Sequence, residues 1–493
     1  SSTTAGNLTF NNTLDGPHNL ALNTSGNTVF NAIVGGIDPL TTITTDAPGG
    51  TIINTTAVTT TGNQTYNDPV ALTSDTALAT TASGNITFNN TLNGPHNLAL
   101  NTAGNNVFNA IVGGVNPLTT ITTDAPGGTV INTPAVTTTG NQSYNDPVSL
   151  TSDTTLATIA AGNITFNNTL DGAQNLVLNT AGNNVFNAIA GGLDPLTTIT
   201  TDAPGSTIIN TTAVTTTGNQ TWNDPVTLTS DTTLATTMAG HITFNNTLNG
   251  PHNLALNTAG NTVFNAVVGG VTPLTTITTD APGGTIINTT AVTTTGNQTY
   301  NDPVSLTSDT ALSSTTAGNL TFNNTLNGPY NLALNTAGNN VFNAIVGGLD
   351  PLTSITTDAP GGTVINTTAV TTTGNQTYND PVSLTSDTAL ATTMAGHITF
   401  NNMLNGPHNL ALNTAGNNVF NAVVGGVNPL TTITTDAPGS TIINTTAVTT
   451  TGNQTYNDPV TLTSDTALSS TTAGNLTFNN TLDGPHNLAL NTS

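Results

Sequence analysis

Histidine and aspartate are the side chains of this sequence best suited to acid–base or metal chemistry, because its 493 residues include no Lys, Arg or Cys and its acidic residues are all Asp. Histidine titrates near neutral pH. Five of the seven histidines share one position of an internal repeat, namely His18, His96, His252, His408 and His486. Two further repeats carry Gln174 and Tyr330 there, and His241 and His397 stand where other repeats carry Asn. A position that accepts His, Gln or Tyr is expected to be a surface turn, so no catalytic histidine is predicted.

Asp68, in the phrase YNDPV, is the position where Ca²⁺ binding comes into question. Calcium takes six to eight oxygen ligands, usually from several closely spaced acidic residues. The sequence has no GGxGxD or DxDxDG spacing, and Asp before Pro is a common turn device. We therefore expect no cofactor and no metal site, with calcium at Asp68 as the alternative left open.

Asparagine and threonine form other patterns that resemble functional motifs. Asn7, Asn11, Asn54 and Asn63 open N-x-T sequons, which arise by chance in a chain this rich in Asn and Thr. The phrases TTITT and AVTTTG resemble the threonine arrays of ice-binding solenoids, but they occur once per repeat in differing frames. Threonine is also a common exposed strand former, and this is the expected role.

The charge balance excludes several classes of partner. The formal net charge is −24 and the chain has no Lys or Arg. It therefore has no cationic side chain with which to neutralise phosphates or to bind an anionic membrane. No apolar run approaches the ~18 residues of a membrane span, and no signal or transit peptide is visible. Enzymes on parallel β-helices combine carboxylates with Arg or Lys in a cleft. This chain offers neither the cations nor a break in its periodicity, so no enzymatic activity is predicted.

The whole chain, 1–493, is predicted to be one continuous repeat array without a separate domain. The glycine of the phrase GNxTFNN recurs at a constant interval, and a fixed period of this kind must be settled before any domain count. It falls at Gly6, Gly84, Gly162, Gly240, Gly318, Gly396 and Gly474, the last repeat being partial. Ser1 and Ser493 match residues inside other repeats, so we expect an excerpt whose ends are both cut within a repeat.

Short β-strands are expected throughout, because Thr, Val and Ile favour strands while Gly, Asn and Asp-Pro interrupt them. Phe10-Asn11, Phe30-Asn31, Ile53-Asn54 and Tyr66-Asn67 stand in similar local frames, 20, 23 and 13 residues apart. Strands in loops of about twenty residues predict a β-solenoid whose turns stack at roughly 4.8 Å. Four turns per repeat give about 19 Å per repeat and a rod of about 120 Å. The 13-residue step is short for a turn.

Equivalent side chains in such a stack are expected to form ladders. Phe10 would lie over Phe30, and the asparagines that follow would form an amide ladder in which each donates to one turn and accepts from the other. Asn89 belongs to this ladder, whereas Asn93 lies in a turn position that is Asp in other repeats. Asp46, Asp68 and Asp75 each recur once per repeat, far enough apart for solvent to screen their repulsion.

The aromatic position that holds Trp222 in one repeat is expected to have an open side or to lie against a loop, because it holds Tyr in the others. These are Tyr66, Tyr144, Tyr300, Tyr378 and Tyr456. The alternative fold is a string of immunoglobulin-like β-sandwich domains, which would also suit the seven or so strand-like segments of each repeat. The regular sub-period within each repeat favours the solenoid.

The phrases GNITFNN and GNxVFNxxVGG, tandem and rich in Gly, Asn and Thr, resemble the repeat regions of filamentous haemagglutinin-type bacterial adhesins and related large surface exoproteins. This resemblance implies a right-handed parallel β-helix that is secreted to the cell surface. It implies an extracellular stalk or filament whose partners are host or neighbouring-cell surfaces and matrix, contacted through regions outside this segment. A carbohydrate-active β-helix enzyme and a matrix filament that self-assembles end to end are the alternative functions.

Overall fold

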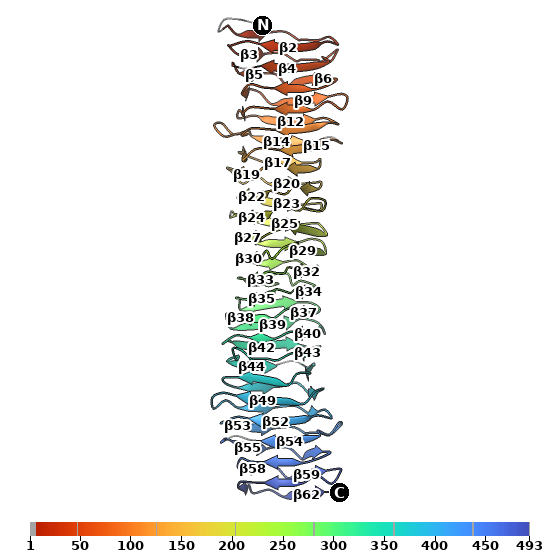
Figure 1. Ribbon diagram of the computed structural model, residues 1–493, viewed down its shortest axis with the longest axis vertical. Coiled ribbons are helices and arrows are strands. Elements are labelled where there is room, and N and C mark those ends of the chain that lie inside the picture. Colours follow the sequence, from red (N-terminus) through yellow and green to blue (C-terminus); the bar gives the residue numbers. More distant parts are fainter. Residues whose placement is uncertain are drawn as a thin grey trace. The chain divides into compact units, whose positions relative to one another are not determined.

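The computed structural model describes residues 6–46, 48–124, 126–202, 204–279, 282–357, 360–435 and 438–492. Within these ranges the protein is all β: its elements are short strands, and no described residue lies in a helix. Neighbouring strands pair in parallel, turn upon turn, which makes the fold a β-solenoid (Figure 1). Immunoglobulin-like sandwiches are built from antiparallel strands, so the alternative fold is wrong.

The chain divides into two compact units, residues 1–246 and 247–493. The boundary falls directly after the fourth copy of the repeated phrase, which reads GHITFNN at 240–246, and the strands of each unit follow the same pattern. The expectation of a single continuous array stays a prediction. The copies of Asp46 at 280, 358 and 436, and the terminal Ser1 and Ser493, lie outside the described residues.

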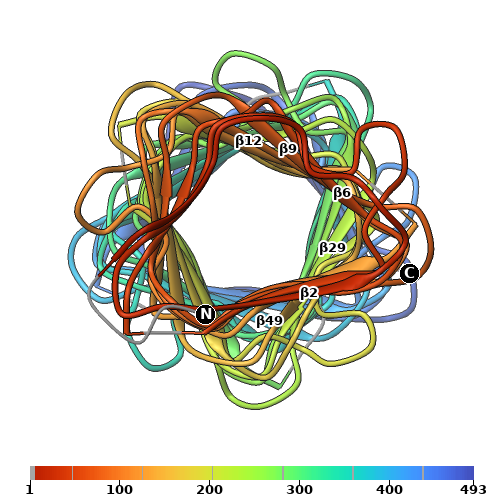
Figure 2. The same ribbon diagram turned by 90° about the horizontal axis from the view of Figure 1, so that it is seen from above.

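The turns of the first unit have three faces, and most turns contribute a strand to each face. In some turns one face is formed only by isolated bridges, as at Val34, Val112 and Ala190. Strands β9 and β12 lie on a different side of the turn from β2 (Figure 2). Face A contains β1 (Leu8–Phe10), β3 (Thr28–Phe30), β5 (Thr51–Ile53), β8 (Val70–Leu72), β11 (Leu92–Asn93), β16 (Ala135–Thr138), β19 (Thr154–Thr158), β22 (Asn175–Asn179), β24 (Thr198–Thr201), β27 (Gln220–Trp222) and β30 (Ile242–Phe244). Face B contains β2 (Asn19–Asn23), β4 (Thr42–Asp46), β7 (Gln64–Tyr66), β10 (Ile86–Phe88), β13 (Asn105–Phe108), β15 (Gly128–Ile131), β18 (Val148–Leu150), β21 (Leu170–Asp171), β26 (Ala213–Thr216) and β29 (Thr232–Thr236). Face C contains β6 (Ala57–Thr60), β9 (Thr76–Thr80), β12 (Asn97–Asn101), β14 (Thr120–Thr123), β17 (Gln142–Tyr144), β20 (Ile164–Phe166), β23 (Asn183–Phe186), β25 (Ser206–Ile209) and β28 (Val226–Leu228).

The length of a turn corrects the expected four turns per repeat. On face A the register advances in eleven steps through Leu8, Thr28, Thr51, Val70, Leu92, Val112, Val136, Leu156, Leu178, Thr201, Trp222 and Phe244. Those eleven turns cover almost the same length of chain as three repeats, which run from Gly6 to Gly240. One repeat therefore makes three and two-thirds turns, so the corresponding strands of consecutive repeats lie on different faces.

The GNxTFNN strand shows this rotation directly. Phe10 lies on face A, Phe88 on face B and Phe166 on face C, and Phe244 returns to face A. Features that the sequence repeats are thus distributed around all three sides of the turn. This distribution is a consequence of repeat length alone.

One step of the predicted frame is wrong. Phe10, Phe30 and Ile53 pair in register as expected, but Ile53 continues to Leu72. Tyr66 lies on another face, between Thr45 and Phe88. The 13-residue spacing from Ile53 to Tyr66 therefore leads from one face to the next within a turn.

Within each unit, inward side chains form a core in which aromatic rings stack along the turns. Tyr144 stacks on Phe166 with ring centroids 5.5 Å apart, and Phe166 stacks on Phe186 at the same distance. Tyr144 and Trp222 are both completely buried. The expectation of an open side at this aromatic position is wrong, because the slot points into the core in every repeat.

The asparagine ladder is confirmed, with the corrected frame. Asn89 Nδ2 donates to Asn67 Oδ1 at 2.7 Å, and Asn89 Oδ1 accepts from Asn109 Nδ2 at 2.7 Å. Asn132 extends the ladder by one more turn, and Asn67 donates to the carbonyl oxygen of Thr45. Asn89, Asn109 and Asn132 are exposed and Asn67 is half-buried. The amide bonds between them join adjacent turns, which fixes the register of those turns at that corner.

Candidate functional site

The predicted histidine position lies on the surface, as expected. His96 Nδ1 is 3.4 Å from Asp75 Oδ1, and about a third of the histidine side chain is exposed. The backbone N–H of Asn97 is the largest cause that lowers the pKa of Asp75, followed by the Asn97 amide and, with a smaller effect, by His96. The Asp75 carboxylate thus accepts hydrogen bonds from the backbone N–H and the side-chain amide of Asn97 on the next turn.

The Asp68 position is buried, which corrects the expectation that solvent screens its charge. In the second repeat Asp146 Oδ1 accepts from Thr123 Oγ1 at 2.5 Å and from Thr129 Oγ1 at 2.9 Å. Asn106 Nδ2 donates to Asp146 Oδ2 at 3.1 Å. Neutral hydrogen-bond donors from earlier turns therefore satisfy this carboxylate.

No group of three or more His, Asp or Glu side chains that could hold a metal ion occurs among the described residues. Calcium at Asp68 would have to take its remaining ligands from hydroxyl, amide or backbone oxygens. Within the described ranges, no helix is long and apolar enough to cross a membrane.

The sequon and threonine residues have structural roles. Asn11 and Asn54 belong to an amide ladder through Asn31, and Asn63 Oδ1 accepts from the backbone N–H of Asn85. Many threonines lie inside the turn, where their hydroxyls bond to main-chain oxygens, as Thr76 does with Thr55 at 2.8 Å. Threonine therefore also has a buried role, in addition to the expected role as an exposed strand former.

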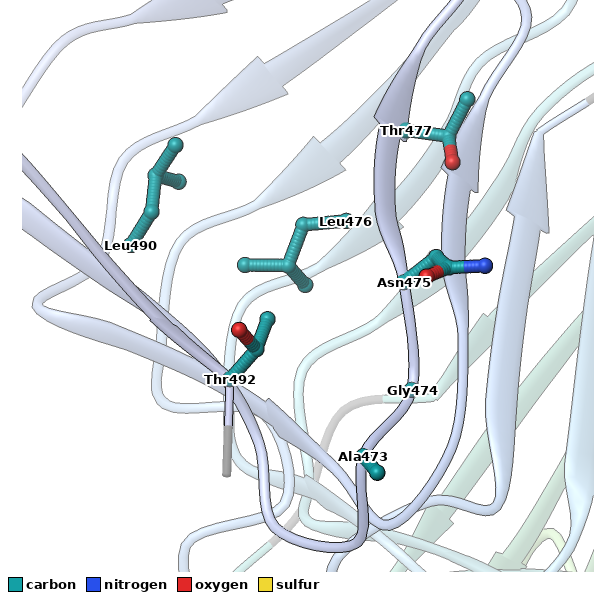
Figure 3. A pocket seen from close by; sticks show the side chains of 7 residues that line it. All are labelled: Ala473, Gly474, Asn475, Leu476, Thr477, Leu490 and Thr492. Carbon is teal, nitrogen blue, oxygen red and sulfur yellow. The ribbon is translucent and has the colours of Figure 1, made fainter.

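A hollow of about 580 Å³ opens beside the C-terminal turn, lined by Ala473, Gly474, Asn475, Leu476, Thr477, Leu490 and Thr492 (Figure 3). Its lining consists of three aliphatic side chains, a glycine, two threonines and an asparagine, and includes no acidic or basic side chain. The hollow therefore offers no group for acid–base chemistry.

The most distinctive surface feature was missed by sequence reasoning. It is a five-residue excursion, here called the tip loop, that comprises residues 35–39 in the first repeat. Val34 and Leu40 form bridges with Val58 and Thr60 of β6, so the loop leaves the middle of a strand, opposite Thr59. Its phrase G-G-aliphatic-x-P recurs in every full repeat and was the signal that could have found it.

Each tip loop projects an aliphatic side chain into solvent. The tip residues and their exposed fractions are Ile37 (89%), Val115 (91%), Leu193 (91%), Val271 (87%), Leu349 (91%) and Val427 (71%). A single exposed aliphatic residue needs no explanation. Six at one position differ from the other strongly exposed apolar residues, Ile159, Met238 and Met394, whose positions carry Thr in some repeats.

The backbone of the tip loop is held by the turn below it. Asp15 Oδ1 accepts from the N–H of Ile37 at 2.9 Å and of Asp38 at 3.3 Å, and Gly16 N–H donates to the Asp38 carbonyl. The bond from Ile37 is the largest cause that lowers the pKa of Asp15. Gly35 has φ +66°, and a Cβ there would lie 2.1 Å from the Thr59 carbonyl oxygen, so this turn requires glycine.

The same arrangement explains the Asn93 position, which was predicted to tolerate Asp. Asn93 Oδ1 accepts from the N–H groups of Val115 and Asn116, as Asp171 Oδ1 does from Leu193 and Asp194. Only an acceptor is needed here, so carboxylate and amide are interchangeable. The position caps the tip loop and holds its aliphatic residue in one place.

Comparison with known proteins found no matching family model, no matching curated protein and no matching solved structure. The candidate site is therefore defined by geometry alone. Its elements are a hydrogen-bonded loop, an exposed aliphatic tip and a capping acceptor. Together they suit contact with another surface rather than chemistry on a substrate.

Proposed function

We propose that this chain is an extracellular structural and adhesive fibre, the repetitive stalk of a bacterial surface adhesin or filament. The observation that carries the proposal is the construction of each unit: parallel turns joined by main-chain bonds, a continuous core and exposed amide ladders. Such a stack spaces its ends by a fixed rise per turn without any further partner. The resemblance of the GNxTFNN phrases to haemagglutinin-type repeats supports a surface location.

The absence of cations in the sequence agrees with a spacer that repels other surfaces of the same sign. Net charge far from zero favours solubility. The receptor contacts of such a fibre would lie in regions beyond this segment. The repeats would supply reach and stiffness.

Surface labelling with and without the array tests this proposal. An antibody against the repeats should label intact, unpermeabilised cells of the source organism. Deleting whole repeats in frame from the genomic copy should reduce adhesion to host or neighbouring cells while leaving secretion intact. Labelling that requires permeabilisation would contradict the proposal.

The two alternative functions predict other results. A carbohydrate-active enzyme should release reducing ends from polysaccharides, and the buried position of Asp146 argues against its use as a catalytic acid. An end-to-end matrix filament should lengthen with protein concentration in electron micrographs of the purified chain. Neither result is expected from a stalk.

A further inference from the structure

A shallow apolar depression lies on the same face as the first tip loop. It has a volume of about 340 Å³ and its floor includes Ala77 of β9 and Ala99 of β12. Asp75, Asn97 and Thr120 form one rim, joined to one another by hydrogen bonds. The depression exists because alanine takes outward positions that carry larger side chains elsewhere.

The register places tip and depression only a few turns apart. Val34, which precedes the loop, bridges to Val58, and Val58 pairs with Leu78 on the strand that carries Ala77. Leu78 pairs in turn with Leu100, on the strand of Ala99. The separation along the stack is therefore about 10 to 15 Å, at roughly 4.8 Å per turn.

The second unit contains the same pairing of features twice. Val268, before the tip residue Val271, bridges to β36 (Ala291–Thr294), which leads through β39 (Thr310–Ser314) to β42 (Asn331–Thr336). Ala311 and Ala333 line a depression of about 350 Å³ there. Leu349 stands in the same relation to a depression of about 370 Å³ lined by Ala389 and Ala411.

We propose that the tip loops dock into these alanine-lined depressions on a second copy of the chain, so that neighbouring solenoids associate side by side. A two-fold interface needs one surface that carries both a projection and its complement. Each of these faces has both, so two antiparallel chains can exchange tips reciprocally. This inference is independent of the adhesive function, since a single stalk and a bundle of stalks could both adhere.

A second copy fits this surface better than other occupants. Nucleic acid and anionic lipid are disfavoured because the chain has no cation to attract them. The projections and depressions come from the same repeat, so a partner with matching spacing is already available in another molecule. Because consecutive repeats present their tips on different faces, one chain can contact more than one neighbour.

The second repeat provides a natural contrast. On the face that carries Val115, the two positions equivalent to the floor alanines are Thr155 and Val177. Both side chains are larger than alanine. Replacing the floor alanines by this Thr–Val pair is therefore a change that the fold already accepts.

The charge of the chain gives the association a distinctive salt dependence. Each copy carries −24, so like-charge repulsion opposes contact at low ionic strength. Salt shortens the Debye length from about 30 Å at 0.01 M to about 3 Å at 1 M. Association through apolar tips should strengthen as salt is added, whereas binding to a cationic partner would weaken.

Sedimentation equilibrium of the purified chain, over a range of concentrations and at low and high NaCl, tests the proposal. The average mass should rise above 49.6 kDa with concentration, and more so at high salt. One variant changes all six tips to Thr: Ile37→Thr, Val115→Thr, Leu193→Thr, Val271→Thr, Leu349→Thr and Val427→Thr. A second fills the floors: Ala77→Thr, Ala99→Val, Ala311→Thr, Ala333→Val, Ala389→Thr and Ala411→Val.

Both variants should weaken association by about tenfold or more, because each contact loses buried apolar area. The matched control removes other exposed apolar side chains by Ile159→Thr, Met238→Thr and Met394→Thr, and should associate like the wild type. Circular dichroism establishes that each variant is folded. A wild type that stays at 49.6 kDa under every condition, or equal weakening by the control, would overturn the proposal. Tip-dependent binding to phosphatidylcholine vesicles by a chain that stays monomeric would overturn it as well.

Discussion

The second and third repeats differ at the buried aromatic position, which is Tyr144 in one and Trp222 in the other. The difference separates the contribution of apolar packing from that of buried hydrogen bonds. In the second repeat the Tyr144 hydroxyl donates to Gln142 Oε1 at 2.9 Å, and Gln142 Nε2 donates to two main-chain carbonyls. In the third, Trp222 fills the slot edge-on to Phe186, with ring centroids 6.2 Å apart. Trp222 Nε1 and Gln220 Oε1 are then buried without hydrogen-bond partners.

The comparison shows that filling the core with an aromatic ring and completing its buried hydrogen bonds are two separate requirements. Both rings are completely buried, so each supplies the apolar contact that the core needs. Only tyrosine also completes the hydrogen bonds of the buried glutamine. Burial raises the pKa of Tyr144 and the neighbouring Asp146 carboxylate raises it further, so the phenol stays a donor.

The largest expected effect comes from removing the ring altogether. Tyr144→Ala should lower the free energy of unfolding by about 3 to 5 kcal/mol, as truncation of a fully buried aromatic ring does. Phe88→Ala should cost about as much, since Phe88 lies in the same kind of stack between Tyr66 and Phe108. Urea titrations of both variants measure this. A cost at Phe88 alone would restore the open-sided slot that the sequence suggested.

Removing only the hydroxyl of Tyr144 should leave Gln142 Oε1 without a donor, as Gln220 Oε1 is in the third repeat. Tyr144→Phe should cost about 1 to 3 kcal/mol, because Gln142 Oε1 is left buried without a donor. Phe166→Tyr is the opposite control, since it adds a hydroxyl where the structure provides no glutamine partner. Unchanged stability of Tyr144→Phe would show that the hydrogen bond from Tyr144 to Gln142 does not contribute to stability.

Repairing the third repeat should be stabilising. Trp222→Tyr supplies Gln220 with the donor that it lacks and removes a buried indole N–H, at the expense of some ring volume. We expect a net gain of about 1 kcal/mol. Thermal melts compare this variant with Trp222→Phe, which loses volume without adding a donor and should be destabilising. A loss in both would show that the indole ring contributes more through packing than its unpaired N–H costs.

The smallest effects belong to the outer side of the turn. Asn89→Asp should cost less than about 1 kcal/mol, because the ladder is exposed and water can replace the lost donor. The cost should fall at acid pH, where a protonated carboxyl donates again. Asn93→Asp should be silent at every pH, since that position only accepts. Thermal melts of both variants at neutral and acid pH measure this, and equal effects at the two positions would remove the distinction between ladder and cap.

The short strands, the solenoid fold and the asparagine ladder could be predicted from the sequence, because alternating strand residues and repeated Phe-Asn phrases are local patterns. The ladder through Asn89 and the acceptor role at Asn93 follow from which residues the repeats exchange. The predicted pairing of Tyr66 with Ile53 was wrong because Ile53-Asn54 and Tyr66-Asn67 have similar local sequences, although they lie on different faces. Burial of Asp146 depends on hydroxyls from residues 17 and 23 positions away, which no local pattern reveals.

The turn register is the central claim, and disulfide trapping tests it most directly because the chain has no cysteine of its own. Thr65 and Thr87 are outward partners on adjacent turns, within the roughly 4.4 to 6.8 Å between Cα atoms that a disulfide spans. Thr65→Cys with Thr87→Cys should therefore form a disulfide on mild oxidation of the native protein. Ile52→Cys with Thr65→Cys, adjacent only if the 13-residue step were a turn, should remain reduced. The reverse outcome would contradict three and two-thirds turns per repeat.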